Sequence, residues 1–236
     1  MSARLAVRFP PQPPRDAEGE WIEVAFPDGR TQALRLHDYE DVYAVPGLYE
    51  EVVQHRLGCR TPAWMAGMLS SAAAGLGWAP ADVRVLDAGA GNGLSGEALA
   101  AAGLRPVLGL DILPAARAAA LRDRPDVYGD YLVADLCALS PEQERTIRAA
   151  APNALACVGS VGGDHLPPGA VRAALELLTP HALVAYGYDV ERFEDPLAAL
   201  LAPHGRELGR ERRLHRRTVT GGERHWEAAV FELDRA

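Results

Sequence analysis

The sequence predicts an α/β protein built around a mostly parallel sheet that carries helices on both faces. From Val83 onward, short apolar segments alternate with amphipathic segments of about ten residues, which is the pattern of parallel strands joined by helical crossovers. The end of the chain departs from this pattern. RELGRERRLHRRTV and HWEAAVFELD are joined by TGGER with no helix between them, so we expect an antiparallel strand pair that closes the sheet.

The elements of this core follow one another in a regular order. Strands are expected at 83–89, 106–111, 131–136, 154–160 and 182–189, and helices at 94–103, 114–122, 141–150, 168–178 and 195–205. The chain has 236 residues, of which 48% are hydrophobic, enough for one such domain with an added segment.

The first 80 residues fall outside this alternation. Residues 1–19 are rich in proline and are expected to form a flexible tail. WIEVAF and TQALRLH flank PDGR, which predicts a β-hairpin over residues 21–37, and Pro46-Gly47 separates two short helical segments. Thr61-Pro62 opens a third helix that ends near Gly75. We therefore divide the chain into a tail (1–19), a hairpin and helical extension (20–80) and a core (81–236).

Charge and composition narrow the class of protein. The formal net charge is −8, which disfavours nucleic acid as a partner. The segment GRERRLHRR, residues 209–217, is basic, but it lacks aromatic residues on which bases would stack and is more typical of a solvated strand face. All basic residues apart from histidine are arginine, and the abundance of alanine, glycine, proline and arginine is typical of a GC-rich bacterial genome.

The cysteines and the apolar segments indicate a cytoplasmic location. Cys59, Cys137 and Cys157 form no paired pattern, so we expect no disulfide framework and no metal site. The first residues contain no apolar run of signal length, and no segment is long enough to cross a membrane. The oligomeric state, monomer or homodimer, stays open.

The stretch VLDAGAGNG, residues 85–93, contains two overlapping glycine fingerprints. Gly91, Gly93 and Gly96 match the dinucleotide pattern G-x-G-x-x-G, whereas Gly89, Gly91 and Gly93 match G-x-G-x-G directly behind a strand. The first glycine should follow the strand end, which selects Gly89 and leaves Gly96 as a packing position on the next helix. Asp87 would repel a pyrophosphate but would attract the ammonium of an amino-acid-bearing ligand.

This stretch resembles motif I of the class I S-adenosylmethionine-dependent methyltransferases, and the resemblance runs from about Val83 to the C-terminus. It is loosely similar to the small bacterial methyltransferases related to the Williams–Beuren-region protein. The resemblance implies a Rossmann-like, seven-stranded sheet and S-adenosylmethionine as the cofactor. It also implies that Asp111 holds the ribose, that Ile112 packs near the adenine, and that Asp135 and Leu136 lie at the adenine edge.

Two of these assignments have competing explanations. Asp111 lies about 20 residues after the glycines, where a dinucleotide-binding protein also needs an acid. Asp135 would equally serve as the N-cap of the following helix. Three acids at the carboxyl ends of successive strands nonetheless favour a ligand site at that edge of the sheet.

The loop GSVGGDHLPPGA, residues 159–170, holds the candidates for catalysis. Gly159 would let the backbone approach the cofactor, and Asp164 and His165 would lie at the mouth of the site, with His165 able to accept a proton near neutral pH. The alternative is a purely structural role, in which Asp164 leads into the next helix and His165 is a surface residue. No Asn/Asp-Pro-Pro-Tyr motif or paired cysteine is present, which disfavours methylation of DNA bases.

Aromatic residues before the core predict a lid over the site. Tyr39, Tyr43 and Tyr49 belong to this segment, and Trp64 and Tyr188 are further candidates for contact with the substrate. Packing of the rings against the core is an equally good explanation. In small-molecule methyltransferases such segments fold over the acceptor, which the resemblance implies here.

The sequence thus predicts an enzyme that transfers a methyl group from S-adenosylmethionine to a small molecule, with O- or N-methylation favoured. An RNA or protein methyltransferase, an NAD-dependent oxidoreductase and a non-catalytic S-adenosylmethionine-binding protein remain as alternatives.

Overall fold

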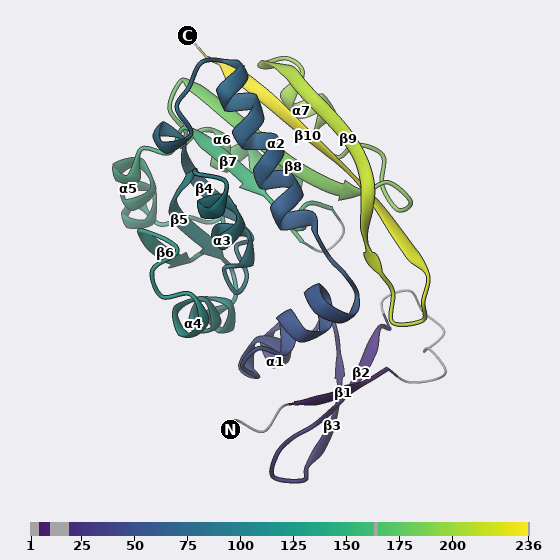
Figure 1. Ribbon diagram of the computed structural model, residues 1–236. Coiled ribbons are helices and arrows are strands. Elements are labelled where there is room, and N and C mark those ends of the chain that lie inside the picture. The colour runs from purple at the N-terminus through teal and green to yellow at the C-terminus, as the bar shows by residue number, and fades with distance from the viewer. Residues whose placement is uncertain (1–4, 10–18, 163–164, 236) are drawn as a thin grey trace.

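A sheet of seven strands forms the centre of the computed structural model, which describes residues 5–9, 19–162 and 165–235 (Figure 1). The strand order is β6-β5-β4-β7-β8-β10-β9. All strands run parallel except β10, which is antiparallel to both of its neighbours. The strands are β4 (Arg84–Ala88), β5 (Arg105–Asp111), β6 (Asp130–Val133), β7 (Ala154–Cys157), β8 (His181–Asp189), β9 (Gly205–Arg217) and β10 (Glu223–Asp234). The predicted mostly parallel sheet with an antiparallel C-terminal strand is confirmed.

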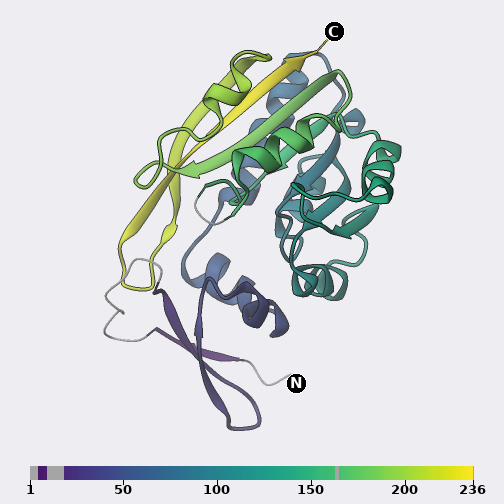
Figure 2. The same ribbon diagram turned by 180° about the vertical axis from the view of Figure 1, so that it is seen from behind.

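Helices cover both faces of this sheet, as the two opposite views show (Figures 1 and 2). α2 (Thr61–Gly75) and α3 (Leu94–Ala101) share one apolar core with the sheet, and α5 (Pro141–Ala150), α6 (Pro168–Leu175) and α7 (Ala198–Leu201) share a second. α4 (Pro114–Asp123) lies beside β6, and the 3₁₀ turn η2 (Pro80–Asp82) leads into β4. α5 starts where predicted because Ser140 and Gln143 form a reciprocal capping box.

The residues before α2 form a small unit with its own apolar core. β1 (Ala6–Arg8), β2 (Trp21–Ala25) and β3 (Thr31–Arg35) make an antiparallel sheet, followed by the helix α1 (Tyr39–Ala44) and the π-helix η1 (Glu50–Arg56). The predicted hairpin is confirmed. Residues 6–8 differ from the expected flexible tail, because Val7 pairs with Val24 of β2 and is buried in the core of the unit.

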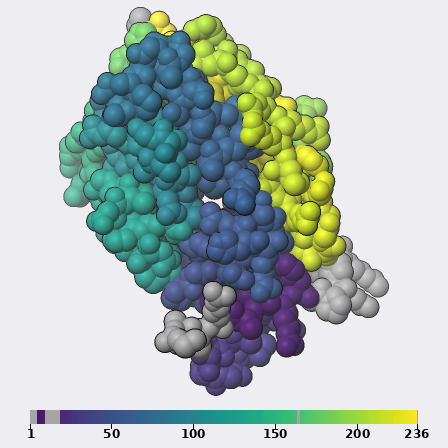
Figure 3. All heavy atoms as spheres, in the orientation of Figure 1, coloured from purple at the N-terminus to yellow at the C-terminus, as the bar shows by residue number. Residues whose placement is uncertain are grey.

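This N-terminal unit, residues 5–9 and 19–57, contacts the core at several places, two of which lie at opposite edges of the main sheet. α1 packs on α4, and the loop joining β9 to β10 reaches the first strands (Figure 1). There Glu20 forms a buried ion pair with Arg216 and accepts a hydrogen bond from the backbone N–H of Val219. In Figure 3 the purple and dark blue surface of the unit adjoins both the teal core and the yellow hairpin. The unit therefore lies against the two ends of the main sheet.

Candidate functional site

The loop between β4 and α3 has the geometry expected of a ligand-binding turn. Gly89, Gly91 and Gly93 have φ angles of +73°, +54° and +86°, a region that favours glycine. The turn begins directly after β4, as the count from the strand end predicts. Gly96 lies within α3, where an added Cβ would come within 2.4 Å of Cζ of Tyr128. Gly96 is therefore a packing position, and the dinucleotide pattern is a coincidence of spacing.

Asp111, at the end of β5, anchors this loop. Its Oδ2 accepts a hydrogen bond of 2.9 Å from the Gly91 N–H, and its Oδ1 accepts one of 3.0 Å from the Leu113 N–H. Burial raises the pKa of its carboxyl group, although these hydrogen bonds oppose the shift. The Tyr131 hydroxyl donates to the Gly91 carbonyl at 2.6 Å, so Gly91 is held on both sides. Ile112 follows Asp111 and is 63% exposed.

Asp87 supports the loop from behind. Its side chain is fully buried, and Oδ2 accepts hydrogen bonds from the hydroxyls of Ser95 at 2.5 Å and Tyr128 at 2.6 Å. Among the described residues its Oδ1 has no hydrogen-bond partner. Desolvation raises the pKa of Asp87 to about 6. The carboxyl group is thus built into the join between β4 and α3, and a contact with a ligand ammonium stays a prediction.

The other residues expected at the cofactor have mixed surroundings. β6 ends at Val133, so the exposed Asp135 lies beyond the strand, and its Oδ1 accepts a hydrogen bond of 2.8 Å from the Cys137 N–H. The alternative that Asp135 caps a helix is wrong, because Ser140 is the N-cap of α5. Leu136 is 3% exposed and belongs to the core.

The loop after β7 lies against the glycine loop. The Ser160 hydroxyl donates to the Ala88 carbonyl at 2.7 Å, and a Cβ added to Gly89 would lie 2.4 Å from that of Ser160. Gly159 has a φ of +76° and faces the ring of Trp226. Gly89 and Gly159 thus permit a close approach of two loops. Asp164 lies outside the described residues.

The tyrosines predicted to form a lid come together over the glycine loop. The rings of Tyr39 and Tyr43 stack at 5.6 Å, and those of Tyr43 and Tyr49 lie 5.4 Å apart. A Cβ added to Gly91 would lie 2.5 Å from the Tyr43 hydroxyl oxygen. The His165 ring lies 5.9 Å from that of Tyr39. Burial raises the pKa of all three tyrosines, which keeps them neutral.

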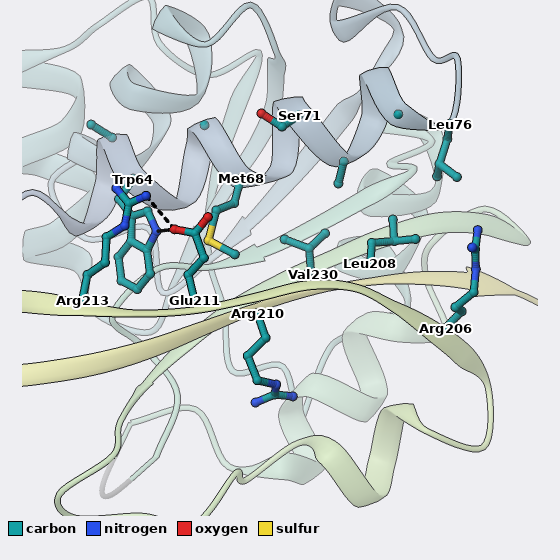
Figure 4. Close-up of a pocket in the computed structure, with 15 residues that line it drawn as sticks. Trp64, Met68, Ser71, Leu76, Arg206, Leu208, Arg210, Glu211, Arg213 and Val230 are labelled. Carbon is teal, nitrogen blue, oxygen red and sulfur yellow. Dashed lines mark hydrogen bonds and ion pairs between the residues drawn. The ribbon is translucent and has the colours of Figure 1, made fainter.

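Trp64 and Tyr188, the remaining predicted substrate residues, are engaged elsewhere. The Trp64 indole N–H donates to Glu211 of β9 at 3.0 Å, and the Tyr188 hydroxyl donates to Glu227 of β10 at 2.5 Å. Trp64 lines a groove of about 690 Å³ between α2 and β9 (Figure 4). The structure therefore does not join Trp64 to the tyrosine cluster, because its indole packs on the outer strand of the sheet.

The sequence analysis did not identify two of the groups at the site. The His37 ring lies 5.9 Å from that of Tyr39, and burial lowers its pKa to about 4. Glu50 of η1 accepts hydrogen bonds from the Asn92 amide at 2.9 Å and from Arg124 at 2.7 Å. His37 lies two residues before Tyr39, a predicted lid residue, and this proximity is a weak sequence signal for a place at the site. The partners of Glu50 lie 42 and 74 positions away, beyond any local pattern.

Little space remains between the glycine loop and the tyrosines. The cavity there measures about 60 Å³ and is lined by Tyr43, Tyr49, Cys59, Gly91, Ser95 and Val158, among others.

Over the described ranges, every helix is too short or too polar to span a bilayer. The same ranges contain no group of three or more acidic, histidine or cysteine side chains arranged to hold a metal ion.

The fold is that of the class I S-adenosylmethionine-dependent methyltransferases. Within the described residues, the sheet ends in β8, β10 and β9 and not in the second βαβαβ half that a nicotinamide-dependent oxidoreductase needs. No family model and no curated protein matches the chain in sequence.

Solved structures of three such methyltransferases show the likeness. The 1,6-didemethyltoxoflavin-N1-methyltransferase of Burkholderia thailandensis is 17% identical over 94% of this chain and 100% of its own, with a TM-score of 0.56. The N-methyltransferase NodS of Bradyrhizobium japonicum is 13% identical (74% and 98% covered, TM-score 0.52). The plantazolicin methyltransferase BpumL, in complex with S-adenosylhomocysteine, is 12% identical (85% and 95% covered, TM-score 0.53). At these identities the likeness concerns the fold alone.

Proposed function

We propose that this protein is an S-adenosylmethionine-dependent methyltransferase that acts on a small molecule. The observation that carries the proposal is the hydrogen bond from the Gly91 N–H to Asp111, which joins a left-handed glycine loop to the acid ending the next strand. Both groups lie at the carboxyl edge of a parallel sheet, where ligands of α/β proteins bind. The fold shared with structures that contain S-adenosylhomocysteine supports this cofactor.

The donor set at this edge fits the cofactor. Asp111 would hold the ribose hydroxyls, and the exposed side chain of Ile112 offers an apolar surface for the adenine. Asp135 would accept from the adenine amino group, with Leu136 fixing the turn from the core side. The glycine loop presents bare backbone to the methionine part, where side chains would obstruct it. When bound, the cofactor supplies an electrophilic methyl group on its sulfonium.

The residues of this chain would then align the acceptor and exclude water. The tyrosine cluster lies at this edge of the sheet, where it would serve the second task as a lid once the cofactor is bound. His165, beside Tyr39, is our candidate for accepting a proton from an oxygen or nitrogen nucleophile. Asp164 stays a candidate on the same loop.

A small-molecule acceptor agrees with the charge and the likenesses. The net charge of −8 disfavours nucleic acid. Two of the proteins with this fold methylate 1,6-didemethyltoxoflavin and plantazolicin, both of which are small compared with a protein or an RNA. We therefore expect O- or N-methylation of a compound of this general size.

Calorimetry on the full chain tests the cofactor assignment. We expect heat of binding with S-adenosylmethionine and S-adenosylhomocysteine and none with NAD or NADH. Asp111→Ala should weaken binding by at least about tenfold, because two hydrogen bonds to a charged group are lost. Asp126→Ala, at an exposed acid, is the control. Absence of heat with both sulfur compounds, in the wild type and in a variant without the Tyr43 ring alike, would overturn the proposed function, and unchanged affinity in Asp111→Ala would show that the ribose lies elsewhere.

A further inference from the structure

The surface of the glycine loop is covered by a side chain of the protein itself. The Tyr43 hydroxyl oxygen lies where a Cβ on Gly91 would be only 2.5 Å away, and the ring carbon Cζ lies 3.3 Å from the same point. Tyr43 is 8% exposed. The backbone of Gly91 is therefore already in contact with an aromatic ring.

Tyr43 belongs to a block of three tyrosine rings that packs on α4. Tyr39 stacks on Tyr43, the tilted ring of Tyr49 contacts both of them, and the group packs against Ala116 and Ala119. These small alanines let the rings approach the helix closely. The block is apolar apart from its hydroxyls, so burial favours the seated position.

A partly buried ion pair holds the block in place. Glu50 of η1 accepts from Arg124, just after α4, at 2.7 Å and from Asn92 of the glycine loop at 2.9 Å. The same guanidinium group donates to the Asn92 carbonyl at 3.1 Å and pairs with Glu97 at 3.0 Å. The side chains of Arg124 and Glu50 are 9% and 15% exposed. Charge-assisted hydrogen bonds are roughly twice as strong as neutral ones, and removing one partner of such a pair leaves the other charge poorly solvated.

The space left beside Tyr43 at the glycine loop is small. It measures about 60 Å³, whereas sites for drug-sized ligands hold about 300–1,000 Å³. The donor groups fit S-adenosylmethionine, but Tyr43 occupies the surface of Gly91 that the methionine part would need. We propose that the structure is a closed, self-inhibited state, in which Tyr43 competes with the cofactor for Gly91 and the Glu50–Arg124 pair keeps Tyr43 there. This inference rests on the proposed function, since the cofactor is the ligand excluded.

Such competition has a measurable consequence. When only a fraction of the molecules is open, the measured dissociation constant exceeds that of the open state by the inverse of that fraction. Weakening the closed state therefore strengthens binding. Residues that merely line the cofactor site would show the opposite sign, because their loss removes contacts.

The experiment compares S-adenosylhomocysteine binding by calorimetry in the full-length wild type and three variants. Glu50→Gln removes the negative charge of the Glu50–Arg124 pair and keeps the shape of the side chain. Tyr43→Ala removes the ring that contacts Gly91. We expect both to bind at least about fivefold more tightly, the equivalent of one ordinary hydrogen bond. Glu51→Gln is the matched control, because this neighbour on η1 pairs with Arg56 of the same helix. Its affinity should stay within about twofold of the wild type.

Hydrogen exchange gives a second reading that does not depend on affinity. In Glu50→Gln the amides of α1 and η1 should exchange faster, while those of β4 keep the wild-type rate. Folding of each variant is checked by its circular dichroism spectrum.

The outcomes separate the two proposals. If the wild type binds and either variant binds more weakly or equally, the self-inhibited state is wrong and Tyr43 or Glu50 is part of the wall of the site. If neither the wild type nor the opened variants bind, the proposed function itself fails, and this inference fails with it.

Discussion

The Tyr43 hydroxyl lies against the Cα of Gly91, although the two residues belong to separate units of the fold. This contact predicts that Gly91→Ala is costly. Left-handed backbone costs alanine about 1–2 kcal/mol, and the collision with Tyr43 adds about 1–3 kcal/mol. Gly221→Ala is the control, since its φ is +87° with open space around it. In a Tyr43→Ala background the cost of Gly91→Ala should fall to that of the control, as urea denaturation would measure; an unchanged cost would refute the contact.

Substitution of alanine for glycine should change the stability of the protein in opposite directions at two helical positions. Gly96→Ala places a methyl group 2.4 Å from the Tyr128 ring and should destabilise by about 1–3 kcal/mol. Gly67 of α2 has nothing within 4 Å, so Gly67→Ala should stabilise by up to about 1 kcal/mol through helix propensity. Thermal melts of both variants check the pair, and equal shifts would mean that α3 is not packed as described.

Asp87 should make stability depend on pH. Its pKa is about 6 in the folded protein and 3.8 ordinarily, so the native state holds the proton more tightly. The resulting stabilisation is complete below about pH 4 and is lost as the pH rises through about 6. Relative to Asp87→Asn, which does not titrate, the wild type should lose about 3 kcal/mol over this window. Denaturant unfolding at several pH values tests this, and a constant difference between the proteins would contradict it.

The ion pair of Glu20 and Arg216 should matter more than any exposed pair. Their side chains are 7% and 6% exposed. Burial opposes ionisation of Glu20, but Arg216 and the Val219 N–H outweigh it, so its pKa is lowered. Glu20→Ala leaves the guanidinium buried without its acid and should cost about 3–5 kcal/mol.

Glu232→Ala provides the comparison for that experiment. Glu232 pairs with Arg206, whose side chain is 68% exposed, so its removal should cost less than about 1 kcal/mol. Limited proteolysis adds a local measurement, because Glu20→Ala should release the N-terminal unit first. Similar costs for the two variants would mean that the buried pair does not anchor the unit.

Periodicity and spacing were sufficient for most of the main sheet and for the glycine loop. Both are local features: a strand end, a sharp turn and a helix start lie within a dozen residues, and counting from Ala88 selects Gly89. Asp111 was placed at the same edge because it ends a strand, and β5 does end at this residue. Asp135 was placed at a strand end, but β6 stops earlier, which illustrates how weakly sequence defines boundaries.

The remaining features depend on contacts between distant segments. The Trp64 indole donates a hydrogen bond to Glu211, which lies 147 positions later in the sequence. Glu50 pairs with Arg124, which lies 74 positions later. The strand β1 forms because Val7 finds Val24, and nothing in its own short sequence requires it. Such pairings arise from tertiary packing, which can override local preference.

The contact between Glu20 and the β9–β10 loop also constrains the order of events during synthesis. Arg216 lies 196 residues after Glu20, and Val219 completes the apolar core of the N-terminal unit. While the ribosome is still translating the core, that unit has neither its ion partner nor its last apolar side chain. The N-terminal unit is therefore completed only after residues 205–234 have been made, and the main sheet acquires its cover at the same time.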